Sequence, residues 1–146
     1  MTFSGYASLF GIADGAGDIV MPGAFRETIA RRGRHGVRML FQHDPSRPLG
    51  IWTGMREDTR GLFVEGELCT SAACVRDIAA LMAEGAIDGL SIGFKTVKAA
   101  HSRLTGLRQL FHVDLWEISL VTFPMLGSAR VSSLGDARVK PANDEI

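Results

Sequence analysis

The 146-residue sequence has little cysteine and no excess of charge of either sign. Its two cysteines, Cys69 and Cys74, fit neither a disulfide framework nor a paired zinc motif. We therefore expect two reduced thiols in a cytoplasmic protein. Sixteen Lys and Arg residues balance sixteen Asp and Glu residues, and this balance argues against binding to nucleic acid or to an anionic membrane.

The sequence also lacks segments that would target it to a membrane or bind a cofactor. Its first residues have neither the basic start nor the apolar run of a signal peptide, and no apolar run reaches membrane-spanning length. The protein is therefore expected to stay where it is made, or to travel inside a particle assembled there. The histidines at 35, 43, 101 and 112 lack the spacing of metal ligands, so we expect no metal and no organic cofactor.

What the sequence does contain is a series of short alternating apolar segments, which predicts an α+β, mostly β domain. We expect the sheet to be curled like a barrel and ringed by two or three helices. One helix is expected from Pro22 to Gly33, and another, capped by Ser71, to about Glu84. The folded domain would span 1–130 and a flexible tail 131–146. The expected strands are 3–10, 37–42, 49–57, 62–68, 89–97 and 111–123.

Among these strands, the segment 89–94 carries a serine in an unusual setting. Leu90, Ile92 and Phe94 share one face of the predicted strand, which leaves Ser91 between Gly89 and Gly93 on the other. Glycine on both sides would let a substrate backbone approach the hydroxyl closely. A small-residue stretch in a packed sheet would give the same pattern, so Ser91 is a candidate nucleophile that needs partners elsewhere.

A buried acid and a strand-end histidine are the candidate partners. Glu117 lies in a strand that is apolar on both faces after Val113, where a carboxylate is costly to bury without compensation. An arginine partner would make it a structural salt bridge, and a histidine partner would make it the group that orients a base. His43, on the apolar face of segment 37–42, is either that base or a core histidine. A serine, a base and an orienting acid together form a nucleophilic triad.

The motif Gly-x-Ser-x-Gly also occurs at the nucleophile elbow of α/β-hydrolases, but three features exclude that fold. The chain is too short, the residues after Ser91 favour a strand over a helix, and no acid followed by a histidine comes after the serine. His101 and His112 both precede Glu117.

Six segments in order resemble the prohead (procapsid maturation) serine proteases of tailed phages, also found in gene transfer agents and prophages. The resemblance implies a barrel similar to that of herpesvirus capsid maturation proteases. Only a short stretch follows Pro124. Relatives often have a longer extension there, which is trimmed or helps to package the enzyme into the procapsid. The matching segments are GYASLFG (5–11), MPGAF (21–25), FQHDPSRPLG (41–50), RGLFVEGEL (60–68), GAIDGLSIGF (85–94) and LWEISLVTFP (115–124).

The resemblance implies that His43 is the base and Ser91 the nucleophile of a serine endopeptidase, with Glu117 as third member and Asp44 and Asp114 as alternatives. The substrate would be the major capsid protein or the scaffold inside an assembling procapsid in the bacterial cytoplasm. The backbone amides of Gly89 and Gly93 are candidate oxyanion donors, and a homo-oligomer is a candidate assembly. Two other functions are considered, a non-catalytic procapsid component that binds scaffold and an esterase or amidase for small substrates.

Overall fold

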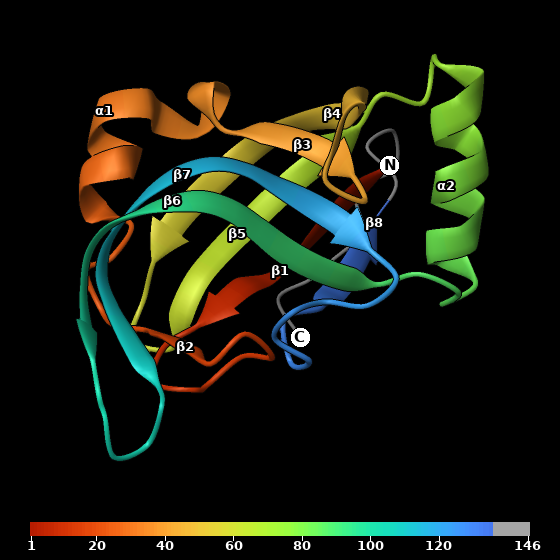
Figure 1. Cartoon of the computed structure of the whole chain (residues 1–146). Helices are drawn as coiled ribbons and strands as arrows, with labels where there is room; N and C mark the ends of the chain where they lie inside the picture. Colours follow the sequence, from red (N-terminus) through yellow and green to blue (C-terminus); the bar gives the residue numbers. More distant parts are fainter. Residues whose placement is uncertain (136–146) are drawn as a thin grey trace, which may run out of the picture.

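Eight strands and two helices form residues 1–135, the part of the chain that the computed structural model describes (Figure 1). Most of these residues belong to a single sheet, as the alternating apolar pattern predicts. In chain order the elements are β1 (Thr2–Leu9), β2 (Asp18–Val20), α1 (Arg26–Gly36), β3 (Arg38–Phe41), β4 (Asp44–Glu57), β5 (Gly61–Leu68), α2 (Ala73–Ala83), β6 (Gly89–His101), β7 (Arg108–Val121) and β8 (Val131–Gly135).

The strands follow the order β2-β7-β3-β4-β5-β1-β8, and β6 pairs with β7 along its other edge. In Figure 1, β6 and β7 form a long hairpin that arches over β5 and β1. The sheet curls so far that β6 meets the residues just before β8. Leu90 N donates to Ala129 O (2.9 Å), and Val131 N donates to Asp88 O (2.8 Å). The predicted α+β class with a curled, barrel-like sheet is confirmed.

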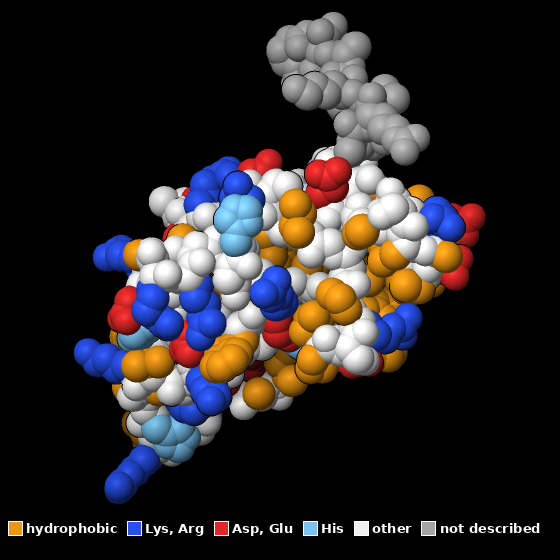
Figure 2. Space-filling model, turned by 90° about the horizontal axis from the view of Figure 1, so that it is seen from above, with side chains coloured by type: hydrophobic (Ala, Val, Ile, Leu, Met, Phe, Trp, Pro, Cys, Tyr) orange, Lys and Arg blue, Asp and Glu red, His pale blue; other side chains and the backbone are white. Residues whose placement is uncertain are grey.

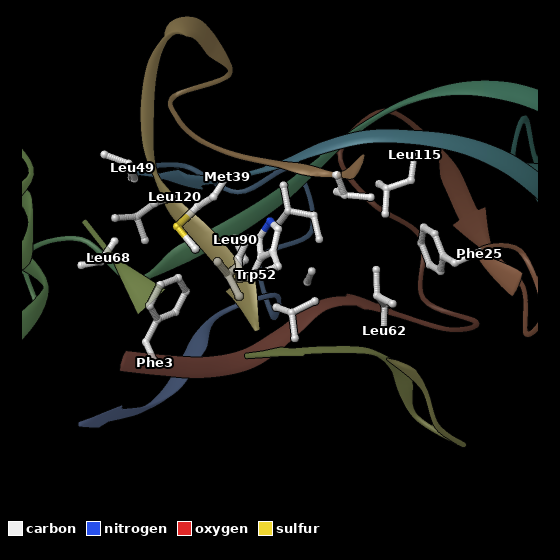
Figure 3. Close-up of a cluster of buried hydrophobic side chains, with 14 of the residues drawn as sticks. Phe3, Phe25, Met39, Leu49, Trp52, Leu62, Leu68, Leu90, Leu115 and Leu120 are labelled. Atoms are coloured by element: carbon white, nitrogen blue, oxygen red, sulfur yellow. The ribbon is translucent and has the colours of Figure 1, made fainter. Parts of the chain in front are cut away.

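The core fills the inside of the curled sheet with large apolar side chains (Figure 3). Trp52 of β4 is 2% exposed and packs edge-to-face on Phe3 of β1, with ring centroids 5.6 Å apart. Leu90 of β6 and Leu120 of β7 reach the same core from the opposite wall. The strands that will carry the polar site are therefore anchored through the apolar side chains on their inner faces.

Both helices begin later than the sequence predicts. Helix α1 begins at Arg26, because the residues from Pro22 to Phe25 form turns. Gly33 interrupts it at φ 64° and ψ 176°, where the sequence predicts its end, but helical residues resume as far as Gly36. Within residues 1–135, neither helix has the length and apolar character that crossing a bilayer requires.

The N-terminus of α2 is not capped by Ser71, because the Ser71 hydroxyl lies 3.3 Å from Cys69 Sγ instead. Its buried face consists of Val75, Ile78 and Met82, which pack against the core. Both cysteines are free and exposed.

The chain after Pro124 holds one more strand than the sequence predicts. Residues 131–135 form β8, which pairs antiparallel with β1, for example Phe3 with Leu134. With two serines and a glycine among five residues, this strand has a weak apolar pattern. The expected tail at 131–146 is thus a strand over its first five residues, and its remainder lies outside the described residues.

Candidate active site

The pairing of β6 with β7 brings four of the key residues to one face of the sheet. Ser91 lies opposite Ser119, and Gly93 lies opposite Glu117. Because directly paired residues point to the same side of a sheet, these four positions share the outer face. Leu90 and its partner Leu120 point inward, into the core. The two faces predicted for segment 89–94 are therefore present.

A bulge at Trp116 sets the direction in which Glu117 points. Gly93 pairs with Glu117 and Phe94 pairs with Leu115, so Trp116 is an extra residue in β7. Strict alternation would place Leu115 on the face of Glu117, but Leu115 is fully buried in the core. The extra residue reverses the alternation, turns Trp116 outward to 45% exposure and directs Glu117 away from the core.

His43 lies in a tight turn rather than on a strand face. Strand β3 ends at Phe41, and Gln42 and His43 have φ values of 54° and 58°. Residues with a Cβ atom adopt this left-handed conformation at a cost of about 1–2 kcal/mol each. Residues 44–48, which follow this turn, form the irregular start of β4. Strained backbone held in place by its surroundings often marks a functional position.

His43 and Glu117 are joined by a short hydrogen bond. His43 Nδ1 lies 2.7 Å from Glu117 Oε2. This bond raises the pKa of His43 above its ordinary value of 6.5, although partial burial of the ring works in the opposite direction. When Nδ1 carries the proton shared with the carboxylate, Nε2 is the nitrogen that can accept another.

The other two acidic candidates have different partners. Asp114 forms ion pairs with Arg31 (2.8 Å) and Arg32 (3.0 Å), whose hydrogen bonds and charges hold the pKa of Asp114 below its usual value despite partial burial. Asp44 accepts hydrogen bonds from the backbone N–H and the hydroxyl of Ser46. Of the three acids, only Glu117 is hydrogen-bonded to the His43 ring in residues 1–135.

The Glu117 carboxylate is also fixed at its second oxygen. The Ser119 hydroxyl donates to Glu117 Oε1 at 2.7 Å, and the Glu117 side chain is only 12% exposed. A carboxylate whose two oxygens both accept hydrogen bonds loses less free energy on burial than an unpaired one.

The two glycines that flank Ser91 make room for the protein's own chain. A Cβ atom at Gly93 would lie 2.5 Å from Glu117 Oε2, so a larger residue there would displace the carboxylate. A Cβ atom at Gly89 would lie 2.6 Å from Val121 O and 2.7 Å from Pro124 Cδ. We interpreted these glycines as space for a substrate, but the structure gives both of them an internal reason.

Ser91 and His43 line the same cavity of about 210 Å³. The cavity lies where the curled sheet is open, between β6 and β1, and Ile12 and Met125 form part of its apolar wall. Ser91 is 7% exposed, and no hydrogen bond joins it to His43 among residues 1–135. The structure therefore brings His43 and Glu117 into direct contact and places Ser91 on the same cavity as His43.

Other hollows do not gather this set of groups. An apolar groove of about 480 Å³, lined by Leu40, Trp116 and Glu117 among others, also borders His43 but does not include Ser91. A larger hollow of about 1150 Å³ lies by Met1 and Cys69 and holds none of the candidate residues.

Figure 2 shows Lys and Arg side chains more frequent toward the end with α1 than toward the end with α2. Residues 1–135 contain no cluster of three or more His, Cys, Asp or Glu side chains suited to a metal ion.

Two residues of the site were not predicted as functional, Ser119 and Gln42. Ser119 had a signal in the sequence, because it is two residues from Glu117 in a strand and so shares its face. Gln42 had none, since its role depends on the left-handed turn.

Comparisons with known proteins point to one family. The family described as caudovirus prohead serine protease matches residues 1–143. The prohead protease of Enterobacteria phage HK97 is 36% identical over 134 residues, which is 90% of this chain and 59% of that protein. The prohead protease of Escherichia phage T5 is 29% identical over 112 residues, 76% of this chain and 52% of that protein. The chain thus spans little more than half the length of these relatives.

A solved structure shares the fold at low sequence identity. The crystal structure of KSHV protease with a hexapeptide phosphonate inhibitor superposes with a TM-score of 0.55 at 11% identity, covering 93% of this chain and 65% of that one. The likeness supports the fold that the sequence predicts, a curled sheet similar to that of a herpesvirus protease.

Proposed function

Since the chain belongs to the caudovirus prohead serine protease family, we propose that it is a serine endopeptidase that cleaves capsid or scaffold protein inside an assembling procapsid. The observation that carries the proposal is the hydrogen bond of 2.7 Å between His43 and Glu117 beside a cavity that Ser91 also lines. A base oriented by an acid next to a serine hydroxyl is the arrangement that acyl transfer needs.

In the proposed reaction, His43 Nε2 takes the proton of the Ser91 hydroxyl as Ser91 Oγ attacks the scissile carbonyl carbon. Glu117 holds the imidazole and stabilises its charged form. When the tetrahedral intermediate collapses, His43 gives the proton to the leaving amine and an acyl-enzyme remains. Water, deprotonated by His43, then hydrolyses the acyl-enzyme and restores the Ser91 hydroxyl. A movement that shortens the Ser91–His43 approach would accompany substrate binding, because catalytic hydrogen bonds often tighten only in the complex.

The proposal is tested by co-expressing the chain with its cognate major capsid protein, followed by mass spectrometry of the new termini. Ser91→Ala should leave the capsid protein at full length while particles still begin to assemble. Ser133→Ala, at an exposed serine of β8, is the matched control and should process normally. Normal processing by Ser91→Ala would remove the proposed function.

Labelling with a fluorophosphonate separates the alternatives. The probe should form an adduct on Ser91 of the folded wild-type protein, identified by peptide mapping. Folded protein without an adduct would favour a non-catalytic component that binds scaffold. Turnover of small esters without cleavage of the capsid protein would favour an esterase or amidase.

A further inference from the structure

The turn that carries His43 is fastened to β7 by several hydrogen bonds. Gln42 N donates to Leu120 O at 2.9 Å. The Gln42 side-chain amide donates to Thr122 Oγ1 at 2.7 Å and accepts from Thr122 N at 3.3 Å. His43 N donates to Ser119 Oγ at 2.9 Å. The two left-handed residues are thus held to Leu120 and Ser119 of β7 and to Thr122, the residue that follows this strand.

Ser119 has a position that the other turn contacts lack, because it bonds both the base and the acid. Its hydroxyl donates to Glu117 Oε1 at 2.7 Å and accepts from the His43 backbone N–H at 2.9 Å. The side chain is completely buried, so water does not compete for either bond. One hydroxyl therefore joins the carboxylate to the backbone of the residue that the carboxylate orients.

The strand register extends this connection to the nucleophile. Ser119 pairs directly with Ser91 across β6 and β7. The same two strands thus carry Ser91, Ser119 and Glu117, and His43 is fixed to them through Ser119. Because Ser119 is buried and its proton is directed to Glu117, it is not itself placed to attack a substrate.

We propose that Ser119 is a positioning residue. It holds the strained His43 turn and the Glu117 carboxylate in fixed relative positions, so that the imidazole can accept the proton of Ser91. Thr122 supports the same turn through Gln42. This inference rests on the proposed function, since it concerns the geometry of that reaction. Replacing a residue that orients a functional side chain through a hydrogen bond typically lowers activity by about 10- to 100-fold.

The main test compares Ser119→Ala with Thr28→Val. Thr28 is a second fully buried hydroxyl, which donates to Val113 O (2.8 Å) and accepts from Leu115 N (3.2 Å) away from the His43 ring. In Ser119→Ala we expect kcat to fall by about 10- to 100-fold with little change in KM. In Thr28→Val we expect lower thermal stability but an unchanged kcat for the folded protein.

A second readout is the titration of the His43 ring followed by NMR in the Ser91→Ala background, which needs no turnover. Loss of the anchor in Ser119→Ala should lower the pKa of His43 toward 6.5, while Thr28→Val should leave the pKa unchanged. Thr122→Val, at an exposed position, should shift both readouts in the same direction by a smaller amount and is expected to fold.

The inference is overturned if folded Ser119→Ala keeps the wild-type kcat and His43 titration. It is also overturned if the loss of activity only follows the unfolded fraction. If the His43 titration shifts in Ser119→Ala but the wild-type protein cleaves no capsid protein, the proposed function is wrong. The positioning of His43 by Ser119 would still be supported.

Discussion

Residues 1–135 contain two histidine–glutamate pairs that differ in almost every respect except composition. His43 and Glu117 are 2.7 Å apart and hydrogen-bonded, and the Glu117 side chain is 12% exposed. His112 Nε2 and Glu27 Oε2 are 3.1 Å apart, but the buried His112 nitrogen makes no aligned hydrogen bond, and the Glu27 side chain is 63% exposed. Both pairs place an imidazole nitrogen within 3.1 Å of a carboxylate oxygen, but only the first is joined by a hydrogen bond in residues 1–135.

The difference lies in what surrounds each pair. Glu117 is held by Ser119 at its second oxygen, and His43 is held by its backbone, so neither group can turn away. Glu27 lies in the first turn of α1 and extends toward solvent. A histidine beside a glutamate is therefore not in itself a site. The pair gains a candidate function when the acid is fixed by a further donor and the imidazole borders a cavity with a hydroxyl.

The largest effect that would separate the pairs is loss of the imidazole. His43→Ala should lower kcat/KM by about 10⁵- to 10⁶-fold, because the serine then has no base. His112→Ala should change kcat/KM by less than about twofold, as expected for a residue outside the reaction. Steady-state cleavage of a peptide that spans the cognate processing site measures both. Similar losses in the two folded variants would contradict the distinction.

Replacing the acid should give the next largest effect. Glu117→Gln keeps the shape of the side chain but loses the charge and can force the wrong tautomer on His43, so kcat should fall by roughly 10⁴-fold. Glu27→Gln is the matched control and should retain activity. An active Glu117→Gln variant with normal kcat would exclude Glu117 as the orienting acid and reopen the case for Asp44 or Asp114.

The fold was largely predictable because it depends on alternating apolar residues that act over short distances. The hairpin of residues 49–57 and 62–68 and the two long strands near Ser91 and Glu117 appear in the structure close to their expected ranges. The sequence also predicted that His43 and Glu117 could be partners, and the two side chains form a hydrogen bond. Their catalytic roles stay a prediction.

What could not be predicted depends on contacts between distant segments. The bulge at Trp116 reverses the facing of β7, and a strict period of two cannot reveal an extra residue. Gln42 and His43 adopt left-handed backbone without glycine or asparagine, because Ser119 of β7 and Thr122, which follows the strand, supply the compensating hydrogen bonds. The reason for Gly93 is the carboxylate of Glu117, 24 positions later in the chain.

The pH dependence of activity should sharpen the comparison with a moderate effect. His43 must be neutral to act as a base, and its hydrogen bond to Glu117 raises its pKa above 6.5. Activity should therefore fall as the pH drops, with a midpoint above 6.5 in the kcat/KM profile. The residual activity of Glu117→Gln should show this midpoint at lower pH, whereas Glu27→Gln should match the wild type. If the midpoint stays the same in Glu117→Gln, the loss of activity at low pH comes from the titration of another group.

The smallest expected effect is on stability, and its sign follows from the same raised pKa. A group whose pKa is higher in the folded state stabilises the fold fully below its unfolded pKa, here about 6.5, and this contribution disappears as the pH rises through the folded-state value. The His43 side chain is 43% exposed, so solvent screening should keep the contribution below about 1 kcal/mol. Thermal unfolding between pH 6 and pH 9 should show the advantage of wild type over His43→Gln shrinking toward high pH. The difference in thermal stability between wild type and Glu27→Gln should stay nearly constant over this range. If the difference between wild type and His43→Gln is also constant, the His43–Glu117 bond does not couple protonation to folding.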